Sequence, residues 1–191
     1  MFVDLTLLIT PKIVKNAEAD ERKITIAGHL GTHIDVMKKI FPLDYIERKA
    51  IVFDVSNITD RDIAVSDIDI HKVKKDMCVL FYTGFIEQEK YGTDPYFTNH
   101  PQLSKDLIET LLKKEISIIE IDCAGIIRRG NGHGAMDQYC ADKNVFIVEN
   151  ICNLKSVLLN DKSKEFIINT YPVNYVDVTG LPCRVVAKIM E

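Results

Sequence analysis

The sequence predicts an α/β fold with a mixed sheet, and two observations lead to this prediction. Short, almost continuous apolar runs at residues 50–55 and 77–82 are typical of strands that are covered on both faces. Residues 104–114 follow the run at 77–82 and precede a further apolar run at 116–122. They carry leucines at helical spacing behind Ser104, a residue type that often begins a helix. Strands that alternate with helices indicate the α/β class, and 191 residues are expected to form one domain, residues 1–191.

The first half of the chain contains further predicted strands and two predicted loops. Residues 3–9 form an apolar run that Pro11 ends, and residues 23–26 alternate between polar and apolar types, so both are predicted strands. The polar, charged residues 12–22 are expected to form a loop, and residues 66–69 a short capped helix or turn. Residues 86–100 are rich in turn residues and predict a long loop.

The second half continues the alternation. Residues 116–122 and 145–148 are predicted strands, and acidic residues, Asp122 and Glu149, stand at their ends. Residues 135–143 predict a helix between them. The tail contains strand-like pieces around Pro172, Gly180 and Pro182. Apolar residues make up 47 % of the chain, which is enough for a sizeable core.

The composition excludes several kinds of partner and location. The net charge is −4 and no basic stripe is interleaved with aromatic residues, so a nucleic-acid partner is not expected. The apolar runs have only the length of strands, which argues against a membrane span. The amino-terminal residues lack the features of a signal peptide, and the five cysteines contain no Cys-x-x-Cys pair. We therefore expect a reduced, cytoplasmic protein.

The most informative segment is residues 28–35, which read Gly-His-Leu-Gly-Thr-His-Ile-Asp. His29, His33 and Asp35 are the ligand types of a divalent-metal site with an open position for water. If residues 33–35 are extended, His33 and Asp35 point to the same face, because side chains alternate along a strand. The alternative is that the two histidines are hydrogen-bonded to backbone groups near a turn.

Other motifs carry less information. Glu149 follows an apolar strand and is a candidate fourth ligand, because a buried carboxylate needs a partner that a metal supplies. Asp122 is either a site residue or a helix N-cap. The glycine-rich residues 130–134 match neither phosphate-binding motif and predict a flexible turn. A serine hydrolase has no support, because the chain lacks a Gly-x-Ser-x-Gly elbow.

The segment His29-Leu-Gly-Thr-His33-Ile-Asp35 resembles the signature of the cyclase family, His-x-Gly-Thr-His-x-Asp-x-Pro-x-His. This family of metal-dependent hydrolases includes bacterial kynurenine formamidase and isatin hydrolase. Further elements of the family pattern are matched, in the same order, along the rest of the chain: Asp4-Leu5-Thr6, Tyr82-Thr83-Gly84-Phe85, His100-Pro-Gln-Leu-Ser104, Ile121-Asp122, Ile147-Val-Glu-Asn-Ile-Cys-Asn-Leu154 and Gly180-Leu-Pro-Cys-Arg-Val-Val-Ala187.

The resemblance implies a swivelling β/β/α-type domain with a mixed sheet or barrel-like core and flanking helices. It implies that His29, His33, Asp35 and Glu149 bind one or two divalent cations per chain, with zinc favoured and manganese as the alternative. It also implies an arylformamidase-like hydrolysis of a small amide, formamide or lactam by water that the metal activates. Family members commonly form dimers or tetramers, so a homodimer or homotetramer is expected.

Two departures from the family pattern affect the second metal. Lys39 stands where the family has a proton-transfer histidine, and Asp137 stands where it has a second-metal histidine. We predict catalytic roles for both, with Lys39 paired to Asp137 in place of the second cation. Alternatively, Lys39 faces solvent, or Asp137 is a replacement oxygen ligand, with His133 one helical turn away as a substitute for the lost histidine.

The chain also lacks tryptophan, the residue that commonly stacks on the substrate in the family's formamidases. Tyr91, Tyr96 and Phe97 are the predicted substrate-binding residues in its place, because they supply aromatic side chains from the long loop. A second hypothesis is a catalytically altered metal-binding homologue that acts as a small-molecule binding or sensor protein.

Overall fold

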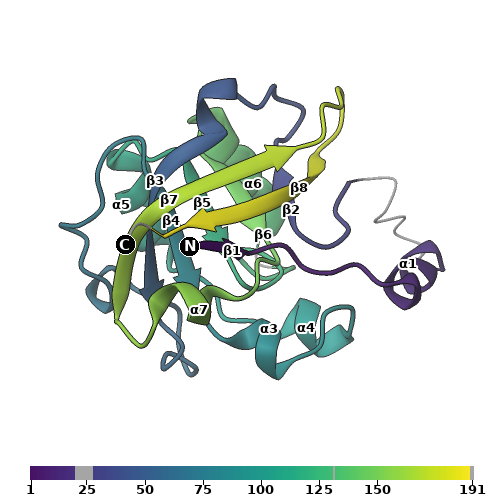
Figure 1. The fold of residues 1–191 in the computed structure, drawn as a ribbon, viewed down its shortest axis with the longest axis horizontal. Helices are drawn as coiled ribbons and strands as arrows, with labels where there is room; N and C mark the ends of the chain where they lie inside the picture. Colours follow the sequence, from purple (N-terminus) through teal and green to yellow (C-terminus); the bar gives the residue numbers. More distant parts are fainter. Residues whose placement is uncertain (20–27, 131, 190–191) are drawn as a thin grey trace.

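The computed structural model describes residues 1–19, 28–130 and 132–189. Its strands form one mixed sheet whose order is β1-β8-β2-β6-β5-β4-β3-β7, and β7 also pairs with β8. This last pairing closes seven of the strands into a barrel, and β1 extends it at β8 (Figure 1). The strands are β1 (Phe2–Asp4), β2 (His33–Asp35), β3 (Glu47–Asp54), β4 (Cys78–Tyr82), β5 (Ile118–Ile121), β6 (Phe146–Glu149), β7 (Ser163–Pro172) and β8 (Gly180–Lys188).

Strands β3 to β6 are parallel, and the remaining pairs are antiparallel. The helices stand outside the barrel and include two that are nine or ten residues long, α5 and α6. They are α1 (Pro11–Glu18), α3 (Phe85–Gln88), α4 (Asp94–Thr98), α5 (Lys105–Lys113), α6 (His133–Asp142) and α7 (Leu154–Leu158), with short 3₁₀ turns at Leu43–Tyr45 and Val65–Asp67.

Apolar side chains fill both sides of the sheet. Alternate residues of the parallel strands point inward, so Val52 and Leu80 belong to the core inside the barrel. Their neighbours Phe53 and Phe81 belong to a second core outside it, which α5 completes with its leucines. Burial on both faces explains why these strands are almost continuously apolar in the sequence.

The predicted fold class is therefore confirmed, and the strands at residues 50–55, 77–82, 116–122 and 145–148 are present within a few residues. The predicted helix at 104–114 is also present, and the Ser104 side chain accepts a hydrogen bond from Leu107 N at 3.1 Å. The predicted strand at residues 23–26 lies outside the described residues. No helix of the described part of the chain is both long and apolar enough to span a membrane.

Two predicted loops contain helices instead. Residues 12–22 were expected to be a loop, but α1 begins at Pro11, and Thr10 caps it through a hydrogen bond from Ile13 N. Proline suits the first helical position, because its missing N–H has no partner there anyway. The long loop 86–100 contains most of α3 and all of α4, which consist of four and five residues and are too short to give a periodic apolar pattern.

Candidate metal centre

The register between β2 and β6 places three predicted ligands on one face of the sheet. Ile34 and Val148 are Cα partners and point into the barrel, where both are fully buried. Their neighbours His33, Asp35 and Glu149 therefore point outward. His33 is also the direct cross-strand partner of Glu149. Because Glu149 ends β6, the site lies at the carboxyl ends of the parallel strands.

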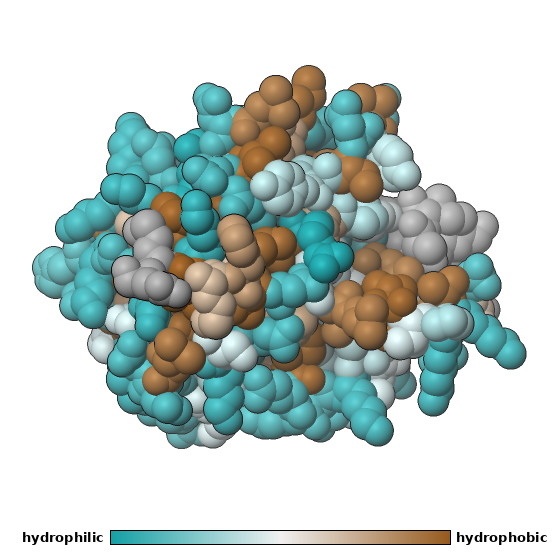
Figure 2. Space-filling model, in the orientation of Figure 1, coloured by the Kyte–Doolittle hydropathy of each residue, from teal (hydrophilic) through white to brown (hydrophobic). Residues whose placement is uncertain are grey.

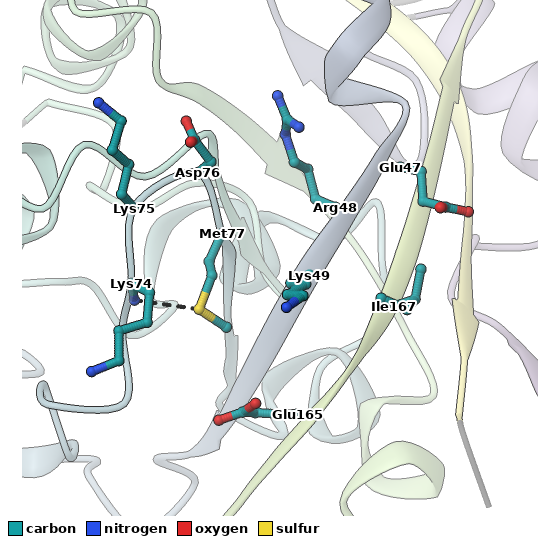
Figure 3. A pocket seen from close by; sticks show the side chains of 9 residues that line it. All are labelled: Glu47, Arg48, Lys49, Lys74, Lys75, Asp76, Met77, Glu165 and Ile167. Carbon is teal, nitrogen blue, oxygen red and sulfur yellow. Dashed lines mark hydrogen bonds between the residues drawn. The ribbon is translucent and has the colours of Figure 1, made fainter.

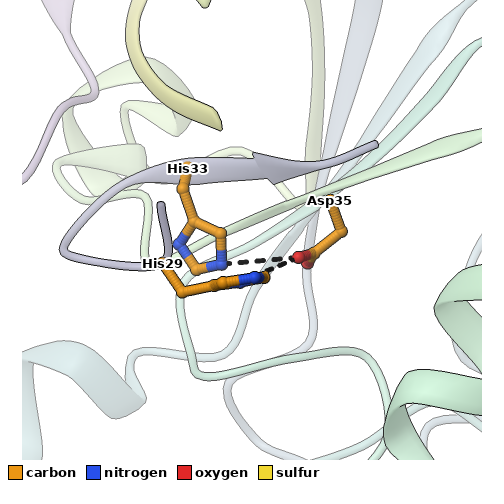
Figure 4. A group of neighbouring side chains, drawn as sticks. All are labelled: His29, His33 and Asp35. Carbon is orange, nitrogen blue, oxygen red and sulfur yellow. Dashed lines mark ion pairs between the residues drawn. The ribbon is translucent and has the colours of Figure 1, made fainter. Parts of the chain in front are cut away.

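The first cluster consists of His29, His33 and Asp35 (Figure 4). Asp35 Oδ1 lies 3.1 Å from His29 Nδ1 and 3.6 Å from His33 Nε2. The predicted extended conformation of residues 33–35 is confirmed, and it explains why these two side chains share a face. Burial tends to raise the pKa of Asp35, but the neighbouring His33 and His29 lower it below its usual value.

The second cluster consists of His133, Asp137 and Glu149. Helix α6 presents His133 and Asp137 one turn apart, so they share a face of the helix. His133 Nε2 lies 3.4 Å from Asp137 Oδ2 and 3.4 Å from Glu149 Oε1. The other oxygen of Glu149, Oε2, lies 3.6 Å from His33 Nε2, so Glu149 stands between the two clusters.

Each histidine has one ring nitrogen held by an oxygen outside the clusters. His33 Nδ1 donates to Gly31 O at 2.9 Å, and His133 Nδ1 donates to Ile127 O at 2.7 Å. His29 Nε2 is hydrogen-bonded to Thr179 Oγ1 at 2.9 Å. A carbonyl can only accept, so Nε2 of His33 and of His133 is free to offer a lone pair. Such outer contacts are typical of metal-ligating histidines, because they fix the ring orientation.

The buried polar atoms of the two clusters fit a divalent cation. Four of them have no hydrogen-bond partner among the residues that the structure describes: His33 Nε2, Asp35 Oδ2, Asp137 Oδ1 and Glu149 Oε1. Burial raises the pKa of Glu149 and of Asp137 well above the usual values, and Asp35 raises both further. A cation between these oxygen and nitrogen atoms would supply the missing partner.

Two glycines allow His29 of the first cluster and His133 of the second cluster to approach. A Cβ atom on Gly180 would lie 2.7 Å from His29 Cε1, and one on Gly125 would lie 2.6 Å from His133 Nδ1 and 2.9 Å from Glu149 Oε1. Real Cβ atoms do not make such short contacts. Gly125 also has a φ of +120°, which other residues rarely adopt. Thr179 and Gly125 carry no local signal in the sequence, whereas Gly180 begins the last of the matched family elements.

The predicted ion pair between Lys39 and Asp137 is wrong. Lys39 Nζ lies 2.9 Å from Asp142 Oδ1, and both side chains are partly exposed, because Asp142 is on a solvent-facing position at the end of α6. Asp137 instead faces His133 and is almost fully buried. The structure thus brings Asp137, His133 and Glu149 together and leaves Lys39 outside both clusters.

The three predicted aromatic residues form one group beside the first cluster. The ring of Tyr91 lies 5.4 Å from Tyr96 and 5.8 Å from Phe97. Gly31 N donates to the Tyr91 hydroxyl at 2.7 Å, which ties the group to the segment that carries His29 and His33. Tyr96 is fully buried, and its hydroxyl donates to Asn150 Oδ1 at 2.7 Å. Tyr96 therefore supports the group from behind, whereas Tyr91 and Phe97 are partly exposed.

Asp122 has a structural role. Its carboxylate accepts hydrogen bonds from Thr83 N and Gly84 N, at 2.9 and 2.7 Å, and so it fixes the turn that starts α3. Burial raises the pKa of Asp122 to about 6. Asp122 is thus not a helix N-cap, because Gly84 holds that position in α3 and Gly132 holds it in α6, and it belongs to neither metal cluster.

A separate pocket lies at the opposite end of the sheet (Figure 3). Its volume is about 580 Å³, and its lining comes from the first residues of β3, the segment 74–77 and β7. Basic and acidic side chains alternate around it, including Arg48, Lys74, Asp76 and Glu165. These residues lie near the amino ends of the parallel strands, so this pocket is not part of the candidate metal centre.

Comparisons with known proteins identify the family of the chain and its fold. A family model described as "Putative cyclase" matches residues 3–126. A solved structure titled as a potential metal-dependent hydrolase with cyclase activity is 21% identical, with a TM-score of 0.75, and the match covers 100% of this chain and 98% of that one. A predicted metal-dependent hydrolase from Bacillus stearothermophilus is 21% identical, with a TM-score of 0.73 and coverage of 98% and 97%.

Isatin hydrolase A from Labrenzia aggregata is 16% identical, with a TM-score of 0.74, and the match covers 100% of this chain and 94% of that one. At such identities these structures establish a shared fold. No curated protein gives a significant match to the sequence.

Proposed function

Because the chain belongs to the cyclase family, we propose that it is a metal-dependent hydrolase that acts on a small amide, formamide or lactam. The observation that carries this proposal is the convergence of three imidazoles and three carboxylates from β2, β6, α6 and the segment before β2. Within the described part of the chain, four of their buried polar atoms lack a hydrogen-bond partner. The isatin hydrolase and hydrolase-titled neighbours add support.

The residues would divide the binding of two cations between them. His29, His33 and Asp35 would hold one cation, and His133, Asp137 and Glu149 would hold the other. Asp137 is proposed as a ligand in place of its predicted catalytic role, with His133 as the nitrogen ligand of the same cluster. Zinc is the proposed metal, with manganese as the alternative. When bound, a divalent cation supplies an acidified water and polarises the carbonyl group of the substrate.

The chain's own side chains orient this site. The carbonyls of Gly31 and Ile127 hold His33 and His133 in one tautomer, and Thr179 positions His29. Tyr91 and Phe97 would offer an aromatic surface to a substrate at the side of the first cluster. Lys39 pairs with Asp142, so its position gives no support to the predicted catalytic role.

The test is hydrolysis of N-formyl-kynurenine and a panel of cyclic amides by the protein loaded with zinc or manganese. We expect turnover by the unmodified protein and its loss, together with loss of bound metal, in His33→Ala. His71 is an exposed histidine far from both clusters in the sequence, so His71→Ala is the matched control and should retain both properties. Turnover retained by His33→Ala would contradict the mechanism.

One observation favours the alternative, a binding or sensor protein without turnover. Lys39 replaces the family's proton-transfer histidine and is drawn away by Asp142. Such a protein would hold stoichiometric metal, hydrolyse no member of the substrate panel and copurify with a metabolite. Mass spectrometry of small molecules released from the native protein distinguishes the two proposals.

We also propose that the protein forms a homodimer through one apolar surface. Loop residues Ile40 and Leu43 are 86% and 81% exposed, and Tyr175 and Val176 at the β7–β8 connection are 62% and 77% exposed. Apolar side chains gather along this edge of the molecule (Figure 2), where they line a groove of about 440 Å³. The β7–β8 hairpin projects next to this groove. This arrangement suits a two-fold contact in which the hairpin of each copy lies in the groove of the other copy. Val176→Asp should shift the sedimentation coefficient to that of a monomer.

Five unpaired cysteines, four of them buried, support the proposed cytoplasmic location.

A further inference from the structure

One segment, residues 125–129, connects the second cluster to the aromatic group. At its start, Gly125 lies against His133 and Glu149. Two residues later, the carbonyl of Ile127 accepts the hydrogen bond from His133 Nδ1. The segment ends at Arg129, an exposed residue whose guanidinium carbon lies 5.2 Å from the centre of the Phe97 ring. Arg129 therefore stands at the border between the second cluster and the aromatic group.

The aromatic group links Arg129 to the first cluster as well. Phe97 packs against Tyr91 at a ring distance of 5.8 Å, and the Tyr91 hydroxyl accepts a hydrogen bond from Gly31 N. A guanidinium over an aromatic face is attracted by the ring, which restricts the freedom of the arginine side chain. The cation is thus held in one place at the edge of the site.

No carboxylate of the residues that the structure describes lies within 4.0 Å of the Arg129 guanidinium, unlike Arg61 and Arg184, which pair with Asp67 and Asp4 at 2.6 Å. Its guanidinium instead lies over the Phe97 ring, and its backbone is two residues from Ile127, whose carbonyl holds His133. Arg129 is therefore a cation beside the centre whose fork of N–H donors is open to an anion.

We propose that Arg129 is a specificity-determining residue that binds the carboxylate of an anionic substrate, whose planar body lies against Tyr91 and Phe97 while its amide faces the two clusters. This proposal rests on the proposed hydrolase function. Arginine binds a carboxylate through two parallel hydrogen bonds, which lysine cannot reproduce. The substrate class is thus an amide or formamide that carries a carboxylate on a flat, apolar body.

The test compares 4-formamidobenzoate with formanilide, which has the same ring and formamide but no carboxylate. The unmodified, metal-loaded enzyme should have the higher kcat/KM with the anion. Arg129→Met keeps most of the packing on Phe97 and removes the charge, so it should lower kcat/KM for the anion by about 10- to 100-fold, as loss of a charged hydrogen bond does. The loss for formanilide should be much smaller, because formanilide has no carboxylate for Arg129 to bind, and Arg129→Lys should restore part of the loss for the anion.

Arg184→Met is the matched control, because Arg184 is exposed and pairs with Asp4. It should leave kcat/KM unchanged for both substrates. The proposal would be overturned if Arg129→Met had the same kcat/KM as the unmodified enzyme for both substrates, or if its kcat/KM fell equally for both. If the unmodified protein hydrolyses neither compound, the hydrolase function fails instead. The role of Arg129 is then tested by calorimetric titration with benzoate and with benzyl alcohol. If Arg129 binds the carboxylate, Arg129→Met weakens the binding of benzoate and leaves the binding of benzyl alcohol as it is in the unmodified protein.

Discussion

The two clusters of the candidate centre differ in composition and in origin. The first has two imidazoles and one carboxylate, and all three residues come from one short segment that ends in β2. The second has one imidazole and two carboxylates, which come from α6 and from the end of β6. Nitrogen-rich sites suit zinc, whereas oxygen-rich sites suit harder cations such as manganese. We therefore expect the first cluster to retain zinc more strongly.

Glu149→Gln should have the largest effect, because Glu149 contacts a histidine of each cluster. We expect both cations to bind more weakly by at least about 100-fold, and hydrolysis to fall with them. The metal-free variant should melt at a higher temperature than the metal-free parent, because a buried carboxyl without a partner is removed.

Titration with zinc measures the expected loss of metal affinity in Glu149→Gln. Thermal unfolding of the metal-free parent and the metal-free variant measures the expected rise in melting temperature. Glu165→Gln alters an exposed glutamate on β7 and should change neither. A Glu149→Gln protein that keeps one cation at full affinity would show that Glu149 serves only one cluster.

Asp137→Asn should separate the two clusters. We expect it to reduce the bound metal from two ions per chain to one and to leave the first cluster loaded, since His29, His33 and Asp35 are untouched. Elemental analysis after dialysis gives the count. Asp142→Asn alters an exposed aspartate of the same helix that pairs with Lys39, and it should keep both ions.

Glu120 offers a buried carboxyl without an imidazole nearby as a contrast to both clusters. It lies inside the barrel, where Thr170 Oγ1 donates to it at 3.3 Å and the Cys78 thiol is a second hydrogen-bond partner, but burial still raises its pKa to about 8. The folded protein keeps this proton over a pH range in which the unfolded chain, with a pKa near 4.5, has lost it.

This group therefore favours the folded state fully below about pH 4.5, and its contribution is lost as the pH rises to about 8, by up to about 1.4 kcal/mol per pH unit. Glu120→Gln should remove that slope from the free energy of unfolding, measured in urea between pH 5 and pH 8. Glu165→Gln should leave the slope in place. Parallel pH profiles for the parent and Glu120→Gln would refute the assignment.

The smallest effects are expected from the two glycines that seat the histidines. Gly125→Ala should displace His133 and weaken the second cation, whereas Gly180→Ala should displace His29 and weaken the first. Each should also destabilise the protein by about 1–3 kcal/mol through overpacking. Gly134→Ala is the control, because a Cβ atom at this helical glycine meets nothing within 4 Å. If metal titrations showed that Gly125→Ala and Gly180→Ala weaken the binding of the same ion, the assignment of one glycine to each cluster would be contradicted.

The difference between the clusters also explains what the sequence could predict. His29, His33 and Asp35 are close in the chain, so the alternation of a strand was enough to place two of them together. Glu149 was recognisable as an acid at the end of an apolar strand. Its direct pairing with His33 depends on the antiparallel register of β2 and β6, which local sequence does not determine.

The partner of Asp137 was harder to predict, because Lys39 and His133 were both plausible neighbours. The choice depends on how α6 packs against β6 and on Asp142, which attracts Lys39 at the end of the same helix. Helix α1 was missed although Thr10 and Pro11 give its start signal, because polar and charged residues make up half of its eight positions and leave only a short apolar face. Long-range packing, more than local propensity, therefore decided the partners of Asp137 and Lys39, whereas the start of α1 was readable from local residues.

Anomalous diffraction from crystals of the zinc-loaded protein tests the central claim most directly. The account predicts two peaks per chain, one among His29, His33 and Asp35 and one among His133, Asp137 and Glu149. A single peak at the first cluster, with Asp137 and His133 turned away from Glu149, would contradict it.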